Sequence, residues 1–139
     1  MPHFLLRLPY CPATDAIESF SFDTVEEYCS VTTTTLASTA VIRVSRGAFD
    51  PARFEEVEPM TRETGKYLIP AIRQLPGLIE YFAAASPTGS IVHISIWDTD
   101  EHAQQMSRLK EMIVNARNDA EAVGVTFVPI VNYPVNWAV

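Results

Sequence analysis

The side chains best suited to chemistry lie in two stretches whose alternating pattern predicts β-strands. Arg43 lies in the stretch 39–46 and His93 in the stretch 90–97. A guanidinium stabilises a negative charge, and an imidazole with its ordinary pKa of about 6.5 can accept a proton. If the two strands are neighbours in the right register, Arg43 and His93 share one face of a sheet. They would then form a candidate catalytic pair for an anionic or phenolate oxygen.

Both side chains also have a structural explanation that the sequence leaves open. His93 would be satisfied by Ser95, two residues along its own strand, or by a backbone carbonyl. Arg43 would pair with an acid such as Glu80. Buried polar groups generally find such partners whether or not they have a catalytic role. Under this interpretation the two residues stabilise the fold and take no part in a reaction.

Four aromatic residues are candidates for the walls of a substrate pocket between a sheet and its helices. Trp97 ends the stretch that carries His93 and would stack on an aromatic ring. Tyr81, Phe82 and Tyr67 are further candidates for the same cavity, because binding sites for small molecules are mostly apolar and aromatic. Packing in the core or at a dimer interface explains each of the four as well, so both interpretations remain open.

The strands that must position these residues follow from alternation with period two. They are predicted at residues 39–46, 78–85, 90–97 and 125–131. Pro129 predicts an edge position or a bulge in the last of them. In the third strand, Val92 and its alternate neighbours make an aliphatic face, while His93 and its alternate neighbours make a mixed one. Both faces are apolar enough that we expect helices on one side and a second protein surface or a ligand on the other.

Two helices are predicted from apolar residues that recur every three to four positions. The first begins at Asp50-Pro51 and extends to about residue 75. We expect it to be segmented or kinked, with breaks near 58–60 and 69–71, because of Pro59 and Pro70. The second is capped by Asp98 and ended by Gly124. It is expected to be one continuous helix of roughly two dozen residues.

The order of these elements is strand, helix, strand, strand, helix, strand, which is the ferredoxin-like plan of the α+β class. It predicts a four-stranded antiparallel sheet in the order 4-1-3-2 with both helices on one face. The domain is expected to cover 39–139, preceded by a flexible or loosely docked extension over 1–38. Whether Cys11 and Cys29 of that extension pair is left open. We expect a homodimer through the open face of the sheet.

Two local motifs resemble a known group of proteins. Pro76-Gly77-Leu78 leads into the second strand, and the third strand ends in Ile96-Trp97-Asp98-Thr99-Asp100-Glu101-His102-Ala103. With these motifs, residues 39–131 resemble the antibiotic-biosynthesis-monooxygenase-like group of the dimeric α+β barrel superfamily. The resemblance implies a dimeric ferredoxin-like fold. It specifies fold better than activity.

The group includes proteins with different activities, so the resemblance implies alternatives. Some members oxidise polyketide quinols with oxygen and no metal or flavin, and others degrade haem with an Asn on the first strand, a Trp ending the third and a His beyond it. Trp97 matches that Trp, but the first strand has no Asn and the next His is His102. The resemblance therefore implies a cofactor-independent monooxygenase acting on an aromatic or phenolic substrate. The alternative is a non-catalytic dimeric domain that binds a small molecule or has an accessory role in stress.

Composition excludes several other classes. The chain of 139 residues is 47% hydrophobic with a net charge of −7, which predicts one globular domain and speaks against binding to nucleic acid or anionic membranes. No apolar run approaches the roughly 20 residues that a membrane helix needs. The first residues lack the pattern of a signal peptide, so we expect a cytoplasmic protein. No spacing of Cys and His indicates a metal site, and no cofactor is predicted.

Overall fold

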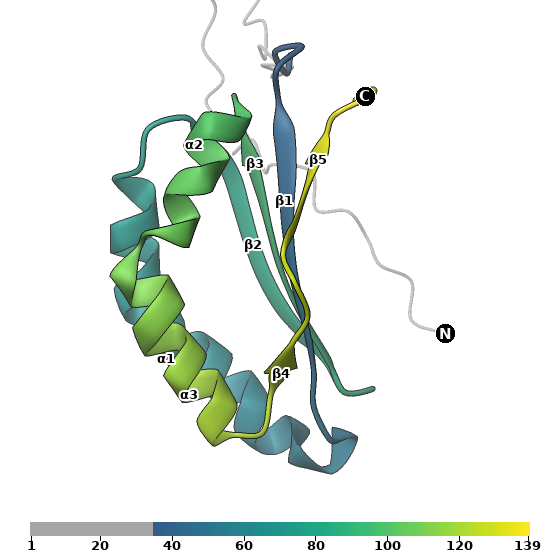
Figure 1. Cartoon of the computed structure of the whole chain (residues 1–139). Coiled ribbons are helices and arrows are strands. Elements are labelled where there is room, and N and C mark those ends of the chain that lie inside the picture. Colours follow the sequence, from purple (N-terminus) through teal and green to yellow (C-terminus); the bar gives the residue numbers. More distant parts are fainter. Residues whose placement is uncertain (1–34) are drawn as a thin grey trace, which may run out of the picture. The chain divides into compact units, whose positions relative to one another are not determined.

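The computed structural model describes residues 35–139 (Figure 1). The expectations for most of the N-terminal extension, including Cys11 and Cys29, therefore lie outside the described residues. The described residues, 35–139, lie within one compact unit. Among the described residues, no helix is long and apolar enough to cross a membrane.

A single antiparallel sheet carries the fold. Its strands are β1 (Val41–Ala48), β2 (Leu78–Ser86), β3 (Ser90–Trp97), β4 (Thr126–Phe127) and β5 (Val131–Pro134). Their spatial order is β2-β3-β1-β4, and β5 also pairs with β1. The predicted α+β class and the ferredoxin-like strand order are confirmed. Strands β1 and β3 are central neighbours, as the position of the candidate pair requires.

The predicted fourth strand is divided into two short ones. β4 pairs with Gly47 and Ala48 near the end of β1, whereas β5 pairs with its first half. Pro129 lies between them, and a proline cannot donate a hydrogen bond to a neighbouring strand. The connection stays close to β1, because Val128 N donates to Arg46 O at 3.0 Å. The prediction of one strand over 125–131 was therefore wrong, although the edge that it occupies is the expected one.

The first helix is less interrupted than its prolines suggested. A short 3-10 helix, η1 (Pro51–Arg53), leads into α1 (Phe54–Arg73), and the Asp50 carboxylate accepts a bond from Ala52 N at 2.9 Å. Pro59 and Pro70 both lie inside α1, so the predicted breaks were wrong. Each proline removes one backbone bond. The helix persists because one side of it, including Val57 and Leu68, is buried against the sheet.

The second helical segment is more interrupted than predicted. It consists of α2 (Asp100–Gln104), a 3-10 turn η2 (Gln105–Ser107), a π-helix η3 (Glu111–Ala116) and α3 (Arg117–Ala122). The prediction of one continuous helix was wrong, because apolar spacing reports which side is buried and not whether the backbone bonding is continuous. Its cap is Thr99, whose hydroxyl accepts from His102 N. Asp98 instead contacts the His102 ring, with Oδ1 and Nδ1 2.6 Å apart.

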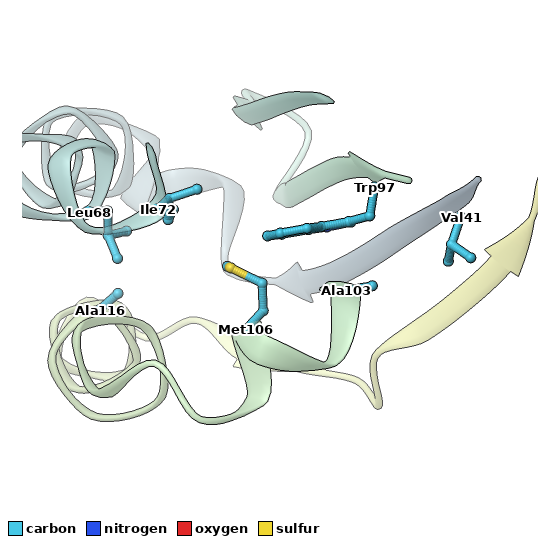
Figure 2. Close-up of a cluster of buried hydrophobic side chains, with 7 residues drawn as sticks. All are labelled: Val41, Leu68, Ile72, Trp97, Ala103, Met106 and Ala116. Atoms are coloured by element: carbon cyan, nitrogen blue, oxygen red, sulfur yellow. The ribbon is translucent and has the colours of Figure 1, made fainter. Parts of the chain in front are cut away.

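All helices cover one face of the sheet, and the main core lies between these two layers (Figure 1). Figure 2 shows the buried cluster, in which Trp97 lies between α1 and the α2–η2 segment. Its members are Val41, Leu68, Ile72, Trp97, Ala103, Met106 and Ala116. The covered face is thus the mixed one, with His93 and Trp97. A second cluster around Val57 and Ile91 closes the other end of the layer.

The aliphatic face of the sheet is the open one. Phe82 pairs with Ile94, and Ile42 with Tyr133, so these side chains point away from the helices. Phe82 is 54% exposed and Tyr133 47%. Val131, on the same face of β5, is also exposed. On this side the described chain exposes apolar side chains of β2 and β5, together with the charged side chains of Arg46 and Glu80.

Candidate functional site

A cavity of about 560 Å³ lies between the covered face of the sheet and the helices. β1 and β3 contribute Arg43, Ser45 and His93 to its wall. The rest of the lining comes from Ile91 on β3, from the helices, and from β4, β5 and the segment that joins them. Its apolar members are Met60, Ile91, Met112, Ile113, Ala116, Ala120, Phe127, Val128, Pro129 and Ile130. This is the size and mixture typical of sites that bind small molecules.

A smaller cavity of about 160 Å³ adjoins the same polar residues. Arg43, His93 and Ser107 line both spaces, and the smaller one adds Tyr81 and Ser95. The register of the central strands explains this arrangement, because Arg43 pairs with Ser95 and Ser45 with His93. Arg43 and His93 therefore occupy diagonal positions on one face of adjacent strands, where side chains are within reach of each other.

Arg43 is a buried cation whose direct partners are neutral. It is only 7% exposed. Its Nη1 donates to Asn132 Oδ1 at 3.2 Å, and its Nη2 donates to Ser107 Oγ at 2.8 Å. Loss of hydration lowers the pKa of Arg43, and the nearby negative charge of Asp100 opposes that shift. No carboxylate forms a direct ion pair with it among residues 35–139, and its two hydrogen bonds to the described residues use two of its five N–H groups.

Asn132 links the buried arginine to a carboxylate at the start of α2. Its Nδ2 donates to Asp100 Oδ1 at 2.8 Å, while its Oδ1 accepts from Arg43. The carboxylate thereby turns the carbonyl end of the amide towards the guanidinium. The sequence analysis missed both Asn132 and Ser107. Neither lies in a motif, and both reach Arg43 only through chain folding, so no local signal marked them.

His93 is paired with a tyrosine. The Tyr81 hydroxyl and His93 Nδ1 are 2.6 Å apart, and the two rings meet edge to face with centroids 5.9 Å apart. Burial lowers the pKa of His93 to about 4. Burial also raises the pKa of Tyr81, and the Arg43 charge partly offsets this. Both groups are therefore neutral near pH 7, and His93 is a weak base.

The other predicted site residues lie elsewhere. Trp97 is fully buried in the core, where its Nε1 donates to Ser95 Oγ at 2.8 Å, and it lines neither cavity. The Tyr67 hydroxyl donates to Asp119 Oδ2 at 2.7 Å and joins α1 to α3. Phe82 points out of the open face of the sheet. Of the predicted aromatic residues, only Tyr81 lines a cavity next to the candidate pair.

No group of three or more His, Cys, Asp or Glu side chains within residues 35–139 is placed to hold a metal ion. Asp100, whose charge acts on Arg43, is bonded to Asn132. Arg43, Ser107 and His93 can form hydrogen bonds with a ligand, and Arg43 can also stabilise a negative charge.

Comparison with known proteins agrees with this fold. No protein-family model and no curated protein matches the sequence. A solved structure of a candidate antibiotic biosynthesis monooxygenase from Deinococcus radiodurans is 17% identical, covers 71% of this chain and 95% of that chain, and has a TM-score of 0.55. A dimeric ferredoxin-like protein from an uncultured marine organism is 10% identical, covers 72% and 98%, and has a TM-score of 0.57. At such identities the likeness shows the fold alone, and at that level the expected resemblance is confirmed.

Proposed function

We propose that this protein is a small-molecule oxygenase that oxidises an aromatic or phenolic substrate, without a metal, in the cavity between sheet and helices. The observation that carries the proposal is Arg43. A guanidinium that is 7% exposed and bonded directly only to neutral groups leaves a positive charge at the wall of a mostly apolar cavity. Burying a charge without a counterion costs free energy, and an anionic ligand oxygen would offset that cost.

The apolar lining complements the rest of such a substrate. A ring system would contact side chains such as Met60, Met112 and Phe127, while its oxygen would face Arg43 and His93. In the proposed reaction the substrate itself supplies all the electrons. One oxygen atom of O₂ enters the substrate as a carbonyl, and the other leaves as water. Arg43 would stabilise the electron-rich anion that reacts with oxygen.

The test is oxygen uptake with a panel of phenols, quinols and anthrones, after treatment with a chelator. Arg43→Met is expected to lower kcat/KM on the order of 100-fold, because a charge-assisted hydrogen bond contributes about 2–3 kcal/mol. Arg43→Lys should retain part of the activity, since it keeps the charge. Arg62→Met, which removes an exposed arginine paired with Glu58, is the matched control. Uptake that is unchanged in Arg43→Met would contradict the proposal.

A second function is favoured by a different observation. The polar groups of the site already have partners within the chain: Arg43 bonds to Asn132 and Ser107, and His93 bonds to Tyr81. Such a site suits a non-catalytic domain that binds a small molecule without turnover. Substrate-dependent oxygen uptake that survives chelation would exclude this function. Tight binding without uptake would favour it.

We also propose that the chain forms a homodimer through its open sheet face. Exposed apolar side chains on that face, including Phe82 and Tyr133, support this assembly. The marine ferredoxin-like protein of the same fold is described as dimeric. Packing two such sheets against each other would bury both apolar surfaces.

A further inference from the structure

We propose that Tyr81 holds His93 in the tautomer protonated at Nε2, so that His93 acts in the cavity as a hydrogen-bond donor and not as the base. The polar end of the cavity would then receive an oxygen that arrives already deprotonated, or as a carbonyl. The assignment of the tautomer stands on geometry alone. The class of ligand rests on the proposed function and deepens it.

The first step concerns Nδ1 of His93. At 2.6 Å from the Tyr81 oxygen, one of the two atoms donates and the other accepts. The tyrosine hydroxyl has no other hydrogen-bond partner among the described residues, and an imidazole nitrogen is its one acceptor there. If Nδ1 carried the proton, the hydroxyl hydrogen of Tyr81 would have no acceptor in residues 35–139. Donation from Tyr81 to Nδ1 uses that hydrogen and leaves the imidazole proton on Nε2.

The second step concerns where Nε2 points. No hydrogen bond joins Nε2 to the described part of the protein, yet no buried side-chain nitrogen or oxygen there lacks a partner. The Nε2 atom is therefore accessible to solvent. Because His93 lines both cavities, this accessible atom faces the cavity space. Its N–H is free to donate to a ligand.

The third step concerns the neighbours of that N–H. Arg43 presents only donors. Ser107 Oγ accepts from Arg43, which leaves its own hydrogen free to donate. Three donors from β1, β3 and η2 thus line the same space. An acceptor oxygen such as a carboxylate, an enolate or a quinone carbonyl satisfies them, whereas an ammonium group satisfies none.

The tautomer can be measured directly. Histidine labelled with ¹⁵N gives long-range proton–nitrogen correlations that identify the protonated ring nitrogen, and His93→Gln assigns the signal among the three histidines of the chain. We expect an unprotonated Nδ1 and a protonated Nε2 in the wild type, and a mixture of both tautomers in Tyr81→Phe. Tyr67→Phe, which removes a hydroxyl bonded to Asp119, is the matched control and should leave the His93 signals unchanged. A proton on Nδ1 in the wild type would overturn the inference.

The ligand class is tested with two probes of the same ring, 2-naphthoate and 2-naphthylmethylammonium, by titration calorimetry. We expect 2-naphthoate to bind at least about tenfold more tightly, and Tyr81→Phe to weaken it about fivefold, the effect of one hydrogen bond. Tyr67→Phe should bind it as the wild type does. If His93 has the expected tautomer but the ammonium probe binds equally well, the ligand class fails together with the proposed function. A proton on Nδ1 would leave Nε2 without a proton to donate, so it would overturn the donor role of His93 whichever probe binds.

Discussion

At the scale of single residues, the site depends on how burial changes the character of ordinary side chains. Arg43 keeps its charge because a guanidinium remains protonated even where burial lowers its pKa, and Asn132 and Ser107 accept its N–H groups. His93 loses its charge instead, since an imidazole adapts to burial by releasing a proton. The pair suggested by the sequence therefore consists of one cation and one neutral ring.

Neutral His93 makes stability depend on pH. Its pKa is about 4 in the folded protein and roughly 6.5 when unfolded, so only the unfolded state gains a proton between these values. The free energy of unfolding is therefore unaffected by His93 above about pH 6.5. As the pH falls towards 4, protonation of His93 in the unfolded state lowers that free energy by up to ~3 kcal/mol. Arg43 and Tyr81, which lie beside His93, do not titrate in this window.

Denaturant unfolding at several pH values between 4 and 7 measures this dependence. Wild-type protein should lose more free energy of unfolding across the window than His93→Gln, in which the titrating ring is absent. Ile69→Gln, which changes an exposed side chain that does not titrate, is the control and should keep the wild-type slope. Equal slopes for wild type and His93→Gln would show that His93 is not held neutral.

At the scale of elements, the turn before β2 requires a glycine. Gly77 has a φ of +81°, which is costly for any other residue. A Cβ there would clash with His102 Nδ1 and Asp98 Oδ1, the pair at the start of the second helical segment. The turn is fixed to the end of β3 as well, because Asp98 N donates to Gly77 O at 3.0 Å. The two motifs that carry the family resemblance are thus in direct contact.

Gly77→Ala is expected to destabilise the protein by at least about 2 kcal/mol. The cost of backbone strain at a positive φ and the cost of displacing the Asp98–His102 pair add together. Gly65→Ala is a matched control inside α1, where a Cβ meets nothing closer than Ile69 Cδ1 at 3.6 Å. It should stabilise by about 0.5–1 kcal/mol, because alanine favours helix. Thermal and urea unfolding measure both variants. A neutral Gly77→Ala would mean that this turn tolerates rearrangement.

At the scale of the whole molecule, the open sheet face is the surface that the proposed dimer would bury. Both central strands present aliphatic side chains there, and β5 adds Val131 and Tyr133. β5 also carries Asn132 on its other side, bonded to Arg43. One short strand thus joins the surface proposed for association to the candidate site.

Phe82→Glu is expected to raise the dimer dissociation constant at least about 100-fold, because it places a charge in an apolar interface. Ile69→Glu is the matched control, since Ile69 is 50% exposed on α1 and lies outside the sheet face. Sedimentation velocity over a range of concentrations distinguishes the two. A monomeric wild type, or a Phe82→Glu variant that still forms a dimer, would contradict the proposed interface.

Local pattern was sufficient for the first three strands, for their spatial order and for the position of Arg43 and His93 on neighbouring strands, because side-chain alternation and the rules for connecting elements follow from local sequence. It did not show that the fourth strand divides into β4 and β5. Pairings between distant segments were not accessible in this way. Asn132, Ser107 and Tyr81 meet Arg43 and His93 only once β5, η2 and β2 pack around them. Which sheet face the helices cover, and where the second helical segment breaks, likewise follow from packing. Burial of side chains from distant segments stabilises those contacts, and a short stretch of sequence does not show which segments will pack together.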